Sequence, residues 1–446
     1  MTRRNLRRGV VIFTVWFLGV QGAVWADGPS LEERIRVLEV RLAKSEELQE
    51  KVANLEREND LLRSKVAALE SVASKAPAGV GAPAVPEKRK PEPVLLDRIG
   101  AKLKVKGRWS GGFFKSGRRG SFHEGSFEVP EAKVLLSFEP DSINTAVMRM
   151  NFNNAAFNSV DYLYLDSKDF LPQLRDTPFT LESRIGRFKL QYGEETLSNN
   201  IVEGALVSNS AANATGTDEG AQLSGAIGKE NPLKWYFSVT NGNSGTGSDN
   251  LTPKAYAGKL AYSPLAPLSL SGSVYHSGSL KTAASEFSFA GVTSRPAGAD
   301  RWDRTLWEVD ARWDFQKGKV IDPPAYTDSK AYIRAAFGQL YDDVGDVTAV
   351  SDREANYGYV ETLCNFHPKW YGAFRYSLID VRHGGSMTLN NAAGDSTRYD
   401  RYSIALGHRW SDKTIIKIGY DINVSDVVSG SDPADDLISA VVVSSF

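Results

Sequence analysis

Apolar and polar residues alternate regularly between Arg398 and Phe446. In one extended segment, Ile404 and Leu406 fall on one face, whereas Ser403 and Ala405 fall on the other. Because successive side chains of a strand point to opposite sides, the alternation predicts a sheet with one apolar and one polar face. The last segment ends on Phe446, which falls on its apolar face. A closing aromatic residue is typical of outer-membrane β-barrels, and the alternative is a soluble antiparallel sandwich.

The same alternation continues backwards along the chain and predicts sixteen strands. They are expected at residues 101–114, 127–139, 143–153, 160–166, 180–190, 221–229, 234–241, 254–263, 268–277, 306–315, 331–341, 357–366, 371–381, 398–410, 414–426 and 436–446. An even number of strands places both ends of the sheet on one side, as in bacterial transmembrane barrels.

The connectors between these strands alternate in length. Tight turns such as Pro140–Ser142 are followed by long loops rich in glycine, serine, asparagine and aspartate, such as residues 242–253. Two connectors, Ser167–Pro178 and Gln316–Ser329, are long where a short turn is due. Transmembrane barrels have short periplasmic turns and long external loops, whereas a sandwich has no reason to sort its connectors. The fold class predicted for residues 99–446 is therefore an all-β transmembrane barrel of about sixteen antiparallel strands.

Residues 1–26 have the pattern of a secretory signal peptide. Four arginines precede an apolar run at Gly9–Val20, and the small residues Val24 and Ala26 precede Asp27. This fits cleavage after Ala26, whereas an uncleaved anchor would need a longer apolar run. We therefore expect the mature chain to leave the cytoplasm.

Residues 27–74 predict an α-helical coiled coil in the periplasm. Its apolar seam has spacings of three and four residues and consists of Leu31, Ile35, Leu38, Leu42, Leu48, Val52, Leu55, Asn59, Leu62, Val66, Leu69 and Ala73. A polar residue in such a seam, here Asn59, usually fixes register and strand number. The seam predicts self-association but does not distinguish a dimer from a trimer, and a lone solvated helix is the alternative.

Residues 75–98 predict a semi-rigid linker, because five prolines between Lys75 and Pro93 prevent helix formation. Its basic run, Lys88–Lys90, is either solvated or in contact with an anionic surface such as the cell wall.

Composition narrows the candidate chemistry. Removing the four leader arginines changes the formal net charge from −1 to −5, which argues against a nucleic-acid partner. The single cysteine, Cys364, excludes an internal disulfide framework. The five histidines (His123, His276, His367, His383 and His408) do not pair convincingly with a serine and an acid. We therefore expect no enzyme, no cofactor and no metal, although aspartate clusters around Asp342 and Asp432 leave calcium as an alternative.

The polar face of the predicted sheet carries many cations. A row of like charges cannot face lipid, where each cation costs about 2–4 kcal/mol at the midplane, so it must line the lumen or its periplasmic rim. The predicted pore-lining cations are Lys102, Lys104, Lys106, Arg108, Arg149, Arg312, Arg334, Arg375, Arg401, Arg409 and Lys417. Two interpretations stay open: a transverse field that attracts anions, or a generic polar lumen whose charges are paired.

The longest early loop, Gln191–Gly220, is a candidate constriction. It is rich in small polar residues and has the length to fold inward, although an ordinary external loop is the alternative. Folded inward, Glu194, Glu195 and Glu203 would place acid opposite the arginines.

The segment Ile185–Glu195, IGRFKLQYGEE, resembles the Gly-x-Phe-Lys-x-Pro-Phe-Gly-x-Glu motif of the phosphate-selective porin O and P family. Gly186, Phe188, Lys189 and Gly193 match, whereas the Pro-Phe pair is absent. The order of signal, coiled coil, linker and barrel is also similar to that family. The resemblance implies a homotrimeric porin for phosphate or another anion such as a dicarboxylate, but no phosphate-binding residue can be carried over.

Together these features predict a passive outer-membrane channel for small hydrophilic solutes in a Gram-negative bacterium, because sixteen strands leave an aqueous lumen. Expected partners are membrane lipid, lipopolysaccharide and, through the coiled coil and linker, peptidoglycan. The alternative function is a structural tether between the outer membrane and the cell wall.

Overall fold

The computed structural model describes residues 102–446, except for 175–176, 199, 215, 244–250, 252, 282, 286, 288, 290–295, 297–298, 316–329, 346–351, 384–395 and 429. The predicted signal peptide, coiled coil and linker lie outside the described residues.

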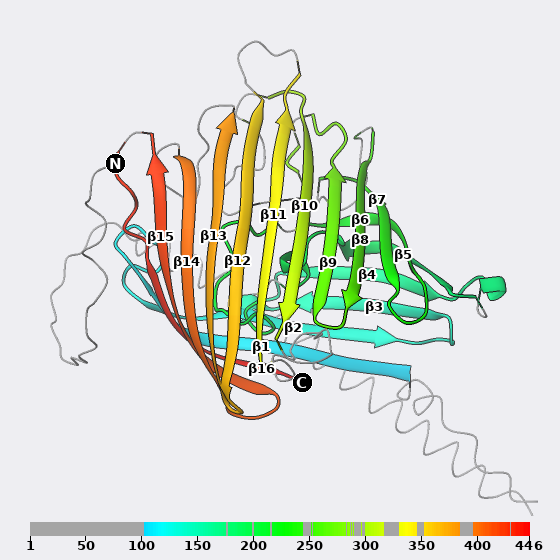
Figure 1. Cartoon of the computed structure of the whole chain (residues 1–446), viewed down its shortest axis with the longest axis horizontal. Helices are drawn as coiled ribbons and strands as arrows, with labels where there is room; N and C mark the ends of the chain where they lie inside the picture. Colours follow the sequence, from blue (N-terminus) through cyan, green and yellow to red (C-terminus); the bar gives the residue numbers. More distant parts are fainter. Residues whose placement is uncertain are drawn as a thin grey trace, which may run out of the picture. The chain divides into compact units, whose positions relative to one another are not determined.

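The described residues form a closed barrel in which each of sixteen strands pairs antiparallel with its neighbours (Figure 1). The strands are β1 (Leu103–Ser116), β2 (Ser126–Phe138), β3 (Asn144–Asn151), β4 (Ser159–Lys168), β5 (Phe179–Lys189), β6 (Thr217–Ile227), β7 (Leu233–Thr240), β8 (Ala255–Leu265), β9 (Leu268–His276), β10 (Asp303–Asp314), β11 (Ala331–Asp343), β12 (Arg353–His367), β13 (Trp370–His383), β14 (Ser396–Arg409), β15 (Thr414–Val427) and β16 (Leu437–Ser445). The predicted sixteen-strand barrel is confirmed, with the ends of individual strands shifted by a few residues.

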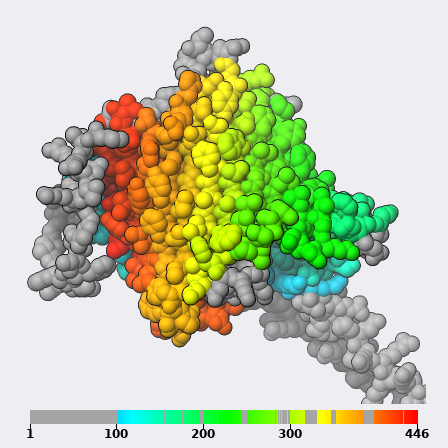
Figure 2. Space-filling model, in the orientation of Figure 1, coloured from blue at the N-terminus to red at the C-terminus, as the bar shows by residue number. Residues whose placement is uncertain are grey.

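The alternation seen in the sequence separates the outer wall from the interior. On β15, Ile418 and Tyr420 are exposed on the outside of the barrel, whereas Lys417 and Asp421 are buried inside it. The outer surface over β9–β15 forms an unbroken wall in Figure 2. A barrel whose apolar side chains face outward is stabilised when an apolar phase surrounds it.

β1 and β16 close the barrel. Gly107 and Phe446 exchange two backbone hydrogen bonds, with N–O distances of 2.8 and 2.9 Å. A side chain on Gly107 would collide with the phenyl ring of Phe446, since an ideal Cβ at this position lies 1.9 Å from the ring. Any larger residue at position 107 would therefore displace the ring of Phe446 from its place over β1.

The connector lengths follow the predicted rule. The start of β1 and the end of β16 lie on the same side as tight turns such as residues 266–267 and 368–369. The connector between β4 and β5 is longer and contains the short 3-10 helix η2 (Pro172–Leu174). The long loops lie at the opposite end, where η1 (Asn153–Ala155) joins β3 to β4. None of the helices in the described part of the chain is both long and apolar enough to span a bilayer.

Two long loops occupy part of the barrel interior. The first, residues 190–216, is termed the inner loop and contains the short helix α3 (Glu195–Ser198). The second, residues 277–302, places Phe287 against Tyr192 and Tyr275, with ring centroids 5.0 and 4.5 Å apart. These rings belong to a buried apolar cluster that also includes Tyr357 and Leu340 on the inner wall. The general rule that long loops are external gives no indication of these inward aromatic residues.

Candidate functional site: the barrel lumen and its inner loop

The inner loop begins with a turn that requires glycine. The amide of Gly193 donates to Ser273 Oγ on β9 at 3.0 Å, and the carbonyl of Gly193 accepts from Lys259 Nζ on β8 at 2.8 Å. Gly193 has a φ of +57°, and an ideal Cβ there would lie 2.3 Å from Glu308 Oε1. Only glycine combines this left-handed conformation with such a close approach to the wall. The turn therefore fixes where the inner loop enters the lumen.

Glu195 and Arg375 join the inner loop to β13. Arg375 Nη1 donates to Glu195 Oε1 at 2.9 Å, and its Nη2 donates to the carbonyl oxygen of Ser208. Glu195 also accepts hydrogen bonds from the backbone and the hydroxyl of Ser210. One arginine on the wall thus holds both limbs of the inner loop.

The far end of the inner loop lies against β15, β16 and β1. Lys417 Nζ donates to the carbonyl oxygens of Ile201, at 2.6 Å, and of Gly204. Glu203 forms an ion pair with Arg108 on β1, at 3.2 Å. Val202 and Val207 pack on the inward valines of β16.

The returning limb is bonded to β13–β15. Ser208 Oγ donates to Asp421 Oδ1 at 2.6 Å, Arg401 Nη1 donates to the carbonyl of Asn209 at 2.8 Å, and Ala211 N donates to Ser377 Oγ at 2.9 Å. These contacts lay the inner loop along the inside of β8–β15 and onto β1.

The inner loop leaves one side of the lumen more open than the other. Side chains beneath it are almost completely covered, with exposed fractions of 2% for Lys259 and 3% for Arg375. On the opposite wall, Lys133 and Arg149 are each 15% exposed and Arg184 is 22% exposed. Charged side chains of β1–β5, termed the open side, are therefore less covered than Lys259 and Arg375, and Arg312 on β10 is similarly exposed at 21%.

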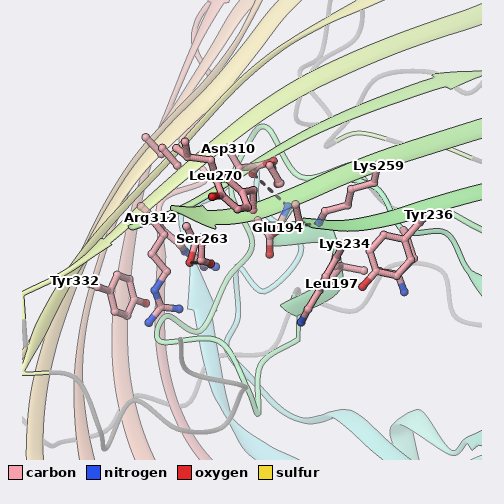
Figure 3. A pocket seen from close by; sticks show the side chains of 18 of the residues that line it. Glu194, Leu197, Lys234, Tyr236, Lys259, Ser263, Leu270, Asp310, Arg312 and Tyr332 are labelled. Atoms are coloured by element: carbon pink, nitrogen blue, oxygen red, sulfur yellow. Dashed lines mark hydrogen bonds and ion pairs between the residues drawn. The ribbon is translucent and has the colours of Figure 1, made fainter. Parts of the chain in front are cut away.

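A cavity of about 310 Å³ lies between the inner loop and β7–β12. Figure 3 shows Glu194 beside Lys259, Arg312 near Tyr332, and Lys234 near Tyr236. The cations are mostly paired: Lys259 binds Glu194 at 2.8 Å, and Arg312 is held in a bidentate contact by Asp314, at 3.0 and 3.1 Å. Lys234 is exposed and makes no ion pair within the described residues.

The wall on the open side consists of linked ion pairs. Arg108 binds Glu131 as well as Glu203, and Arg184 is held in a bidentate contact by Asp166, at 2.7 and 3.0 Å. Arg184 also stacks over Tyr164, 4.1 Å from the ring centroid. Charge in the open part of the lumen is therefore distributed in pairs and not as an isolated row of cations.

The predicted pore-lining cations fall into three groups. Lys102, Lys104 and Lys106 are exposed at the short-turn end, where Lys102 bonds to the Pro140 carbonyl and Lys104 pairs with Glu139. Arg108 and Arg149 face the open side, and Arg312 and Arg334 line the cavity.

The third group consists of Arg375, Arg401, Lys417 and Arg409. Their side chains face inward and bond to the inner loop or to a nearby strand. Arg375, Arg401 and Lys417 hold the inner loop by donating hydrogen bonds to its carbonyl oxygens and to Glu195. Arg409 Nη2 donates to Asn365 Oδ1 at 2.6 Å near a short turn. Alternation alone gives the face of a strand and does not show which inward residues a loop will cover.

Several residues of the open wall were not predicted. Glu131 and Lys133 alternate with apolar neighbours on β2, so the two-residue period contains a signal for them. The calcium alternative concerned the acidic residues around Asp342 and Asp432. Among the described residues no cluster of three or more metal-ligating side chains is present, and Asp342 is buried between Arg304 and Arg353.

No protein-family model and no curated protein matches the sequence. The chain is similar in fold to solved structures of outer-membrane channels and porins, among them the following two. The outer membrane channel DcaP of Acinetobacter baumannii has a TM-score of 0.51 at 12% identity, covering 77% of this chain and 97% of that chain. The anion-selective porin from Comamonas acidovorans has a TM-score of 0.50 at 12% identity, covering 77% of this chain and 99% of that chain. The described barrel therefore has the fold of sixteen-stranded outer-membrane porins.

Proposed function

We propose that the protein is a passive diffusion channel for small hydrophilic solutes in the outer membrane of a Gram-negative bacterium. The observation that carries this proposal is a closed barrel whose outside is apolar and whose inside is charged, with an inner loop along the inner wall and a cavity of about 310 Å³ beside that loop. Sixteen strands enclose enough space for an aqueous path even after one loop folds inward.

The outward aromatic residues support a membrane position. Trp370, Trp410 and Phe446 are exposed on the outside near the short-turn end, at 37%, 68% and 65%. Transmembrane barrels carry aromatic girdles where the hydrocarbon meets water, and their short turns face the periplasm. The same orientation puts the long loops outside the cell.

We propose weak ionic selectivity in place of a strong preference for phosphate or other anions. Arg108, Arg149 and Arg184 face the open lumen, but each is bonded to a carboxylate. Paired charges largely cancel at the distance of a passing solute, so the wall attracts anions less than a bare row of cations would. Selectivity for phosphate and dicarboxylates remains a prediction from the family resemblance.

A homotrimer in contact with membrane lipid and lipopolysaccharide is the proposed assembly, with residues 27–98 reaching toward peptidoglycan. A role as a tether is the second candidate, favoured by the heptad spacing of residues 27–74. Deletion of residues 27–98 separates the two: loss of envelope integrity with unchanged conductance would support both roles.

Single-channel recording of the reconstituted protein tests the main proposal. We expect discrete ohmic steps in planar bilayers, and liposome swelling whose rate falls as uncharged sugars increase in size. Liposomes with heat-denatured protein are the control. A correctly folded barrel that gives neither steps nor swelling would refute the channel.

A further inference from the structure

We propose that Asp161 sets the ionic selectivity of the lumen by neutralising two cations that would otherwise make the channel anion-selective. This inference rests on the proposed channel function and names a specificity-determining residue. It is carried by an irregularity in β4 that turns an additional carboxylate toward the open side of the lumen.

Asp161 lies at a β-bulge. In the pairing of β3 with β4, Arg149 is opposite Tyr162 and Met150 is opposite Val160, so Asp161 has no partner across the sheet. A bulge adds one residue to a strand and re-aims its side chains. Both Asp161 and Tyr162 consequently contact Arg149, although adjacent residues of a regular strand would face opposite sides.

The carboxylate of Asp161 binds two cations from two different strands. Its Oδ2 lies 3.1 Å from Lys133 Nζ on β2 and 3.0 Å from Arg149 Nη2 on β3. The hydroxyl of Ser159 donates to Oδ1 at 2.9 Å, and the ring of Tyr162 lies under the Arg149 guanidinium, 3.5 Å from its carbon. These contacts fix the carboxylate between the two cations.

The group formed by Lys133, Arg149 and Asp161 faces open space, with each side chain 15% exposed. Lys133 is also 3.6 Å from Glu131, which is shared with Arg108. Glu203 of the inner loop also binds Arg108, and Lys189 at the end of β5 interacts electrostatically with the same cations. The charges of this region are therefore nearly balanced, with Arg108, Lys133, Arg149 and Lys189 against Glu131, Asp161 and Glu203. Removing the charge of Asp161 would leave Arg149 without a carboxylate.

An aqueous lumen transmits such a change to a passing ion. One unit charge a few ångströms away alters the local concentration of a monovalent ion by about three- to fivefold in water, and salt screens the effect. A wall with balanced pairs thus suits neutral and zwitterionic solutes, whereas the same wall without Asp161 would favour anions.

The test is the reversal potential of reconstituted channels in a KCl gradient at low ionic strength, for the wild type, Asp161→Asn and Lys133→Met. We expect a potential near zero for the wild type. Asp161→Asn should raise the chloride-to-potassium permeability ratio by about three- to fivefold, and Lys133→Met should lower it. Glu230→Gln, which removes an exposed acid from the turn between β6 and β7, is the control and should leave the ratio unchanged.

The two variants keep the inference testable if one fails to fold. Three outcomes would overturn the role of Asp161 while leaving the channel function intact. The permeability ratio could shift in the same direction in both variants, or stay unchanged in the variant that folds. The wild-type channel could also be strongly anion-selective already. Absence of conductance in folded wild-type protein would instead refute the proposed function itself.

Discussion

Arg375 and Glu195 are joined by a hydrogen bond of 2.9 Å between Nη1 and Oε1, and both side chains are almost completely buried. The same guanidinium lies 3.3 Å from Glu361, which Arg334 and Tyr332 also bind. This places the inner loop in a network of buried charges that begins on the wall and ends in the loop.

The first prediction concerns that network. Replacement of Arg375 by methionine should release both limbs of the inner loop, because Glu195 and the Ser208 carbonyl lose their shared donor. Breaking a buried ion pair by removing one partner costs about 3–5 kcal/mol. We expect larger and noisier single-channel conductance and faster swelling with large sugars. Arg382→Met, at an ion pair that is exposed to solvent, is the control; equal conductance in both variants would contradict the role of Arg375.

The second prediction concerns the turn at Gly193. Gly193→Ala adds the cost of a left-handed backbone, about 1–2 kcal/mol, and a collision with Glu308. Gly345→Ala is a matched control, since Gly345 has a φ of +66° and nothing within 4 Å of an added Cβ. Denaturant unfolding should therefore show a greater loss for Gly193→Ala, together with altered conductance. Similar losses in the two variants would mean that contact with Glu308 does not matter.

The third prediction concerns the closure of the barrel. Gly107→Val should hinder pairing of β1 with β16, because the added side chain occupies the position of the Phe446 ring. Gly272→Val on β9 is the control, as an added Cβ there meets nothing within 4 Å. The yield of folded barrel, measured by its faster gel migration without heating, should fall only for Gly107→Val.

The fourth prediction concerns the second loop. Arg304 binds Asp342 through two hydrogen bonds of 2.7 and 3.0 Å and also donates to the Phe287 carbonyl. Asp342→Asn should leave the buried guanidinium of Arg304 without its carboxylate, which costs about 3–5 kcal/mol in unfolding free energy. Asp343→Asn, beside it but partly exposed, should cost far less. A comparable loss in both would remove this role from Asp342.

The two-residue period revealed the strands because each has one face in an apolar phase and the other in a charged lumen. A shift by one residue would place every side chain on the wrong face, so apolar and polar residues must alternate strictly. Ile418 and Lys417 on β15 are an example, and their opposite environments were predictable from the sequence. The same rule fails at Asp161, since a bulge interrupts the period and the local sequence has no glycine or proline to announce it.

The inner loop was predictable in position but not in its contacts. Its length and small residues indicated an inward fold, yet the burial of Lys417 under three carbonyls depends on where the loop meets a strand more than two hundred positions later in the chain. Contacts of that range depend on barrel closure. The inward position of Phe287 was missed because its contact with Tyr192 is also between residues far apart in sequence.

The pairing of β1 with β16 also has a kinetic consequence. Every other neighbouring pair of strands is adjacent in sequence, whereas this pair joins the two ends of the sheet. Until β16 arrives, the growing sheet has two open edges that can recruit a foreign strand. Such long-range pairing is intrinsically slow and exposes the chain to aggregation. Export in an unfolded, chaperoned form followed by late closure in the membrane would therefore protect this topology.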